Sequence, residues 1–281
     1  TLTPSNLDGY PSAGGDRQGL VIYGTDSGNV LGGNEGDDVI RGQGGEDDIF
    51  GQSGNDQLFG EAGDDRLYGR TENDILNGGD GDDILADGLF QDGSDRGGSD
   101  TLIGGAGIDT ADYSYARAGI RAQLNTGVVA NDGDGASDTL SGIENLIGSR
   151  YNDVLIGDAG ANVLHGGHGS DTLLGLGGDD VLVGGLYSLN TLQGGAGDDR
   201  YIIDSNDTVF ELAGEGIDTV EARINTYVLG AHVENLIFTG FSSAQGTGNA
   251  QNNTITGNFG NDNLRGRGGV DVLNGGLGSD T

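Results

Sequence analysis

Several residue types and segments are missing from this sequence, and each absence excludes a class of structure. It contains no cysteine, so the chain can form no disulfide, no zinc–thiolate site and no cysteine nucleophile. No run of about 18 apolar residues occurs, so the sequence predicts no membrane span. Residues 1–20 lack the basic start and apolar core of a signal peptide. Because the sequence starts without Met and stops inside a repeat, we expect it to be a piece of a longer protein.

Positive charge is also scarce. The 281 residues include 12 Lys and Arg against 45 Asp and Glu, which gives a formal net charge of −33. This balance excludes nucleic acid and anionic membrane surfaces as partners, because both require basic patches. With 60 glycines and few aromatic residues, the composition alone fits a disordered chain about as well as a folded one. The partners that such a charge attracts are cations.

An internal period of nine residues predicts a folded chain and not a disordered one. An aspartate recurs every nine residues, an apolar residue follows each one by two positions, and a glycine precedes each one by five. The aspartates are Asp38, Asp47, Asp56, Asp65, Asp74 and Asp83. Asn29 extends this phase backwards. A second tract holds Glu144, Asp153, Asn162, Asp171, Asp180, Asn190 and Asp199, a third holds Asn253, Asp262, Asp271 and Asp280, and a short pair consists of Asp100 and Asp109.

Each unit has the form G-G-x-G-x-D-x-U-x, where U is apolar, as in residues 166–174. The glycine-rich six residues favour a turn, because glycine tolerates positive φ, and x-U-x predicts a short strand with one inward side chain. Two units then make one flattened coil, and coils stack with parallel pairing. One buried apolar side chain contributes roughly 1.5–3 kcal/mol, whereas ordering nine residues costs roughly 1–2 kcal/mol each. The apolar core alone is therefore too small, and bound ions must supply the difference.

The sixth-position carboxylates predict the ion sites. Coils about 4.8 Å apart align these carboxylates in two columns, so that an ion lies between one repeat and the next but one. Calcium takes six to eight oxygen ligands and tolerates irregular geometry, whereas magnesium demands an octahedron and transition metals favour His or Cys. About 10 to 15 calcium ions would offset much of the charge. The predicted ligands are Asp38, Asp47, Asp56, Asp65, Asp74, Asp83, Asp100, Asp109, Asp153, Asp171, Asp180, Asp199, Asp262, Asp271 and Asp280. The alternative is a solvated acidic face.

The repeat resembles that of the repeats-in-toxin (RTX) family, over most of the chain. The resemblance implies an all-β, right-handed parallel β-roll (a β-helix or solenoid), with turn carbonyls completing each calcium sphere. Those carbonyls belong to residues such as Gly36, Gly45, Gly54, Gly63, Gly81, Gly169, Gly178 and Gly197. It also implies export by a type I secretion machinery and folding on extracellular calcium. The predicted organisation is a leader or cap (1–23), calcium rolls at 24–86, 144–202 and 248–281, and interruptions at 87–143 and 203–247.

Departures from the pattern predict weaker sites. Asn29, Asn162, Asn190 and Asn253 offer a neutral amide in place of the carboxylate, which lowers calcium affinity. Four repeats lack the fourth-position glycine, so we expect those turns to differ or to be strained; the residues there are Glu72, Tyr151, Tyr187 and Gln251.

The interruptions leave the nine-residue phase. Residues 87–99 predict a polar loop, and the stretches 110–130 and 200–245 predict longer strands that cap the rolls. Gly107-Ile108-Asp109-Thr110 recurs as Gly216-Ile217-Asp218-Thr219, which indicates a duplicated unit. Exposed Tyr and Phe side chains there could bind a substrate.

No active site is recognisable. His165 and His168 fall at solvent-facing positions and form no His-Glu-x-x-His motif, and no G-x-S-x-G elbow occurs. The favoured function is therefore a calcium-binding structural module of a secreted or cell-surface protein, such as an adhesin or matrix fibre. Alternatives are the carboxyl-side module of a secreted protease, lipase or alginate-modifying enzyme, and a calcium-dependent binder of surface polysaccharide or of other copies.

Overall fold

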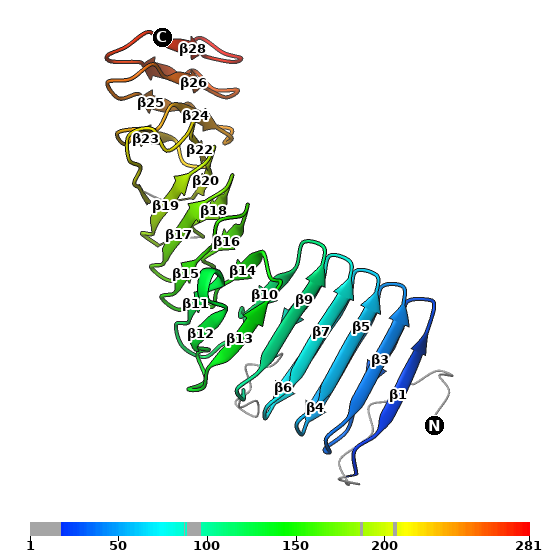
Figure 1. Ribbon diagram of the computed structural model, residues 1–281. Helices are drawn as coiled ribbons and strands as arrows, with labels where there is room; N and C mark the ends of the chain where they lie inside the picture. Colours follow the sequence, from blue (N-terminus) through cyan, green and yellow to red (C-terminus); the bar gives the residue numbers. More distant parts are fainter. Residues whose placement is uncertain (1–17, 87, 89–96, 186–187, 205–206) are drawn as a thin grey trace. The chain divides into compact units, whose positions relative to one another are not determined.

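The computed structural model describes residues 18–86, 88, 97–185, 188–204 and 207–281. The chain forms two compact units, Thr1–Arg150 and Tyr151–Thr281, each built from stacked coils of short strands (Figure 1). The described residues include a single helix, the 3₁₀ turn Leu124–Thr126. None of the helical structure in these residues is long and apolar enough to cross a membrane. The predicted all-β class is confirmed.

Unit 1 contains two sheets. The first has the order β1-β3-β5-β7-β9-β13-β12-β11, and its strands are Val21–Thr25, Val39–Gly44, Gln57–Ala62, Ile75–Asp80, Thr101–Ala106, Asp138–Ser141, Val128–Asn131 and Arg121–Gln123. The second has the order β2-β4-β6-β8-β10-β14, and its strands are Val30–Gly32, Asp48–Ser53, Arg66–Thr71, Ile84–Ala86, Thr110–Asp112 and Asn145–Ile147. Because strands β1 to β10 alternate between the two sheets, each coil in this part contributes one strand to each sheet.

The pairing is parallel and its register is one coil. Ile40 pairs with Leu58 and Leu58 with Leu76, so neighbours in a sheet are 18 residues apart. This is the offset that two nine-residue units predict. Among the described strand pairs, the antiparallel ones are those in which β12 joins β11 and β13, within the predicted interruption.

The core is a ladder of single side chains. The eighth-position residues Ile40, Ile49, Leu58, Leu67 and Leu76 are fully buried, and the strand residues on either side of each are not. Alternation along a strand places only every second side chain inside, so a three-residue segment supplies one core residue per turn. The predicted thin core is confirmed.

Unit 2 repeats this plan. One sheet has the order β15-β17-β19-β21, with strands Val154–Ile156, Thr172–Gly177, Thr191–Ala196 and Thr208–Val209. A second has the order β16-β18-β20-β22-β24-β26-β28, with strands Val163–His165, Val181–Val183, Arg200–Ile203, Thr219–Ala222, Asn235–Phe238, Thr254–Thr256 and Val272–Asn274. A third contains β23, β25 and β27, at Thr226–Val228, Gln245–Thr247 and Asn263–Arg265.

The prediction of longer strands in the interruptions is wrong. The described strands within 110–130 and 200–245 are two to four residues long, whereas the six-residue strands β3 to β7 lie inside the repeats. The sequences there do not need the nine-residue phase, because other residues fill the same core positions: Tyr201, Val220 and Leu236 are fully buried and pair in register. The predicted loop at 87–99 lies mostly outside the described residues, as do residues 1–17 of the leader. The boundaries between rolls stay predictions.

Candidate metal centre

The sixth-position side chains form columns along the edges of the coils. The backbone N–H of Asp38 donates to Asp56 Oδ1 (2.7 Å), and that of Asp56 donates to Asp74 Oδ1 (2.7 Å). In unit 1 the columns are Asp38, Asp56, Asp74, Asp100 and Asp138 on one edge, and Asn29, Asp47, Asp65, Asp83, Asp109 and Glu144 on the other. In unit 2 they are Asp153, Asp171, Asn190 and Asp207, then Asn162, Asp180, Asp199, Asp218 and Glu234, with shorter runs at Asn253 and Asp271 and at Asp262 and Asp280.

These carboxylates are not a solvated acidic face. The predicted ligands from Asp38 to Asp199, and Asp262, are between 1% and 2% exposed. At the last turns Asp271 is half-buried and Asp280 is exposed. A buried ionised carboxylate is costly unless a cation or several donors compensate it. Its second oxygen therefore decides what each turn can bind.

In nine turns of the described chain, that second oxygen is buried and accepts no hydrogen bond, and the second and fourth residues of the turn both have positive φ. We call these the open turns; an example is Gln43 (80°) and Gly45 (92°) ahead of Asp47. In these turns the second residue has a left-handed backbone, and its N–H donates no hydrogen bond to that carboxylate oxygen. The open turns end at Asp47, Asp56, Asp65, Asp74, Asp83, Asp109, Asp171, Asp180 and Asp199, and in each the Oδ2 atom is buried.

In five other turns the second residue's N–H donates to the sixth side chain, and we call these the closed turns. Asn34 N–H donates to Asp38 Oδ2 (2.6 Å), while Asn34 Oδ1 accepts the Gly36 N–H (2.7 Å). This side-chain turn is typical of Asn and Asp and needs no positive φ. The closed turns pair Thr25 with Asn29, Asn34 with Asp38, Asp158 with Asn162, Asn249 with Asn253, and Asn258 with Asp262.

Glycine at the first position is required by close approach. A Cβ on Gly42 would overlap both the Asp47 carboxylate and the carbonyl oxygen of Gly60, one coil further on. A Cβ on Gly63, at the fourth position, would overlap the Gly45 carbonyl oxygen. Carboxylate and carbonyl oxygens of successive coils thus converge on the same glycines, as a site for a hard cation requires.

The pKa values of the column aspartates show that the protein does not compensate their buried negative charges. Burial raises the pKa of Asp56 to about 7 and that of Asp74 to about 9, because desolvation outweighs the single N–H bond that each accepts. Burial likewise raises the pKa values of Asp65, Asp171 and Asp180 to about 7. The columns therefore bind protons or cations.

The family model of the RTX calcium-binding nonapeptide repeat matches residues 23–58, 59–86, 95–112, 138–173, 156–186, 188–202 and 247–281. These segments cover well over half of the chain. The chain belongs to the RTX family. It is a calcium-binding repeat module, and its open turns fit this cation, since each offers a buried carboxylate oxygen that no protein donor satisfies.

The structure shows which type of turn forms where the sequence departs from the RTX pattern. Asn29, Asn162 and Asn253 all end closed turns, in which the amide oxygen accepts the second residue's N–H. Glu72 keeps the glycine-like backbone with φ of 75° and is strained, whereas Tyr151 and Gln251 do not adopt positive φ. Tyr187 lies outside the described residues. His165 and His168 are exposed, as predicted.

The columns also include carboxylates that the nine-residue phase does not predict. Asp138, Asp207 and Asp218 continue three columns across insertions, because each begins or directly precedes a strand that pairs in register. A local signal was present: each begins an Asp-Thr-apolar triplet identical in type to Asp171-Thr172-Leu173. The triplet, not the distance from the previous aspartate, predicts membership of a column.

Proposed function

We propose that the nine open turns are the calcium sites of this RTX module and that its folding is driven by calcium. The observation that carries the proposal is the buried, unpartnered Oδ2 of every open-turn aspartate. Turn carbonyls such as those of Gly45 and Gly63 would complete each site. Nine sites fall just below the 10 to 15 ions expected from the sequence, because six of the fifteen predicted ligands do not end open turns. Among these six, Asp38 and Asp262 end closed turns, and Asp271 and Asp280 are not buried.

Calcium acts here as part of the fold. Ions that bind the native state and not the unfolded chain stabilise it by mass action, and a preformed site does not exist in the unfolded chain. The columns of each unit otherwise hold carboxylates about one coil spacing apart, and those charges repel one another. A chain that is unfolded at low calcium and folded at high calcium suits export as an unfolded polypeptide.

From this we infer an extracellular or cell-surface location, reached through a type I secretion machinery. Extracellular calcium sites have dissociation constants of about 10⁻⁴–10⁻³ M, so such a module folds after export. Its role there is structural, because the stacked coils, held by one buried side chain per turn and by calcium ions, form a regular β-roll. Chemistry, where the whole protein has any, would come from residues outside this repeat.

Circular dichroism tests the proposal. In chelator at neutral pH we expect a disordered spectrum, and cooperative β-structure as calcium rises through about 10⁻⁴–10⁻³ M. Magnesium at equal concentration is the control, and it should be far less effective because it demands octahedral geometry. β-structure that is complete in chelator would refute the proposal.

One exposed aromatic pair favours a second role, the binding of surface polysaccharide. Phe241 is 85% exposed, Phe259 is 66% exposed, and their rings stack with centroids 6.3 Å apart. Exposed aromatic rings that stack in this way suit the apolar faces of sugar rings. A glycan array in calcium should show binding that Phe241→Ala abolishes while the circular dichroism spectrum is unchanged. Equal binding by the variant would refute this role.

A further inference from the structure

Glu211 enters one column from a segment that the family model does not match. It follows β21, which pairs with β19 over only two residues, and the backbone then leaves the sheet. In other coils the first-position N–H donates to a backbone carbonyl, as Gly166 does to Val183 (2.9 Å). Here the N–H of Gly194 instead donates to Glu211 Oε1 (3.2 Å) and to the Tyr201 hydroxyl (2.7 Å). The Glu211 side chain thus replaces main chain at this point.

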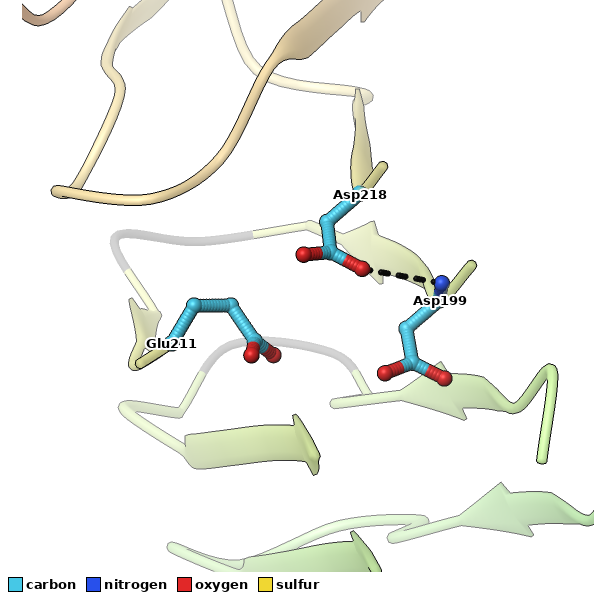
Figure 2. A group of neighbouring side chains, drawn as sticks. All are labelled: Asp199, Glu211 and Asp218. Carbon is cyan, nitrogen blue, oxygen red and sulfur yellow. Dashed lines mark hydrogen bonds between the residues drawn. The ribbon is translucent and has the colours of Figure 1, made fainter. Parts of the chain in front are cut away.

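The carboxylate of Glu211 faces those of Asp199 and Asp218 (Figure 2). One oxygen from each of the three groups lies within 4.8 Å of the other two. The side chains are 1%, 3% and 1% exposed for Asp199, Glu211 and Asp218. Asp218 Oδ1 accepts the Asp199 N–H (3.0 Å), and the Tyr201 hydroxyl donates to Glu211 Oε1.

The remaining oxygens have no protein partner. Asp199 Oδ2, Glu211 Oε2 and Asp218 Oδ2 are buried and accept no hydrogen bond. None of the three carboxylates forms an ion pair in the described part of the chain, and the nearby Arg200 is bound to Glu221 (2.7 Å). Three buried negative groups so close together require a cation or protons.

The spacing admits a calcium ion. Two ligands that each lie about 2.4 Å from a calcium ion are at most about 4.8 Å apart. The three carboxylate oxygens lie within that limit, and calcium is the cation of the nonapeptide repeat that this chain contains. We propose that Asp199, Glu211 and Asp218 form a three-carboxylate calcium site, in which Glu211 is a ligand that the nonapeptide repeat does not encode.

Such a site has more ligand charge than an open turn with one carboxylate, so its affinity is higher. It also fastens the segment after β21 to the turn that ends at Asp199. The inference rests on calcium as the ion of the open turns, but it makes a separate claim about Glu211.

The test counts ions on the whole chain by isothermal titration and equilibrium dialysis. Glu211→Gln keeps an oxygen for Gly194 and Tyr201 but removes the charge. We expect loss of the tightest binding phase, because the ion at the turn that ends at Asp199 then has one ligand charge fewer. The control Glu215→Gln removes a charge from the same segment while its side-chain oxygen still accepts the Leu212 N–H (2.8 Å in the native chain), so the ion count should not change. Equal ion counts and affinities in Glu211→Gln and the native chain would overturn the inference.

A second measurement does not depend on the folding of a variant. A crystal structure of the native chain grown in calcium should show an ion bound by all three carboxylates. Water, or a protonated Glu211 bonded directly to an aspartate, would overturn the site while leaving the open turns as calcium sites. Failure of the proposed function is distinct: the native chain would then bind no calcium at any open turn.

Discussion

Replacing Asp56 by Asn should change the stability of the module in opposite directions with and without calcium. Asp56→Asn keeps an Oδ1 acceptor for the Asp38 N–H (2.7 Å) and removes the charge of an open turn. With calcium at about 100 times its dissociation constant, one lost site removes about 2.7 kcal/mol from the free energy of unfolding. The variant should therefore be less stable than the native chain in calcium.

Without calcium the same substitution should stabilise the fold. Burial raises the pKa of Asp56 from 3.8 to about 7, so at pH 8 its ionised form destabilises the folded state by about 4 kcal/mol. Asparagine has no charge to desolvate. The destabilisation by about 2.7 kcal/mol in calcium thus becomes a stabilisation of the order of a few kcal/mol in chelator.

Asp38→Asn is the matched control. Asp38 ends a closed turn, where its Oδ2 already accepts the Asn34 N–H (2.6 Å). Asn253 accepts the Asn249 N–H (2.8 Å) in the same way within this chain, so an amide fits that turn. We expect no loss of bound calcium and no reversal of sign.

The assay is urea unfolding in excess calcium, and folding induced by trimethylamine N-oxide in chelator at pH 8, both followed by circular dichroism. Opposite shifts of the midpoint for Asp56→Asn, with little change for Asp38→Asn, support the assignment of open and closed turns. Midpoint shifts of the same sign in both buffers would refute the assignment, because replacing a buried carboxylate that binds no calcium has the same effect on stability with and without calcium.

Three further outcomes follow from the same structure. Gln52→Asn should close the open turn at Asp56 by the side-chain bond seen at Asn34, and equilibrium dialysis should count one calcium ion fewer; an unchanged count would contradict the role of the second residue. In chelator, β-structure should increase as pH falls from about 9 to about 5. Burial raises the folded-state pKa of Asp56 to about 7 and that of Asp74 to about 9, so the stability that is present below pH 3.8 is lost as pH rises from 3.8 through these values. A pH titration by circular dichroism that showed the reverse trend would exclude this account. Leu58→Ala should cost about 2–5 kcal/mol in urea unfolding in calcium without changing the number of bound ions; a lost ion would mean that the core and the columns are not separate.

The calcium columns could be placed from sequence to a large extent, because their geometry is local. Asp47 and Asp65 align since two nine-residue units make one coil, and any residue at a fixed place in the unit then repeats along an edge. The same reasoning places Ile40 and Leu58 in one buried ladder. It fails at Asp138 and Asp218, which rejoin their columns after insertions that the period does not count.

The sequence by itself determined the coil, its core and the edges on which carboxylates gather, because these depend on repeat length and on glycine at fixed positions. The tertiary structure decided which carboxylates are left without a partner. That depends on whether the second residue's N–H donates to the sixth side chain, as at Asn34, or the second residue adopts positive φ and makes no such bond, as at Gln43. It also decided that Glu211, from outside the repeat, lies beside Asp199, where the chain leaves the sheet after β21.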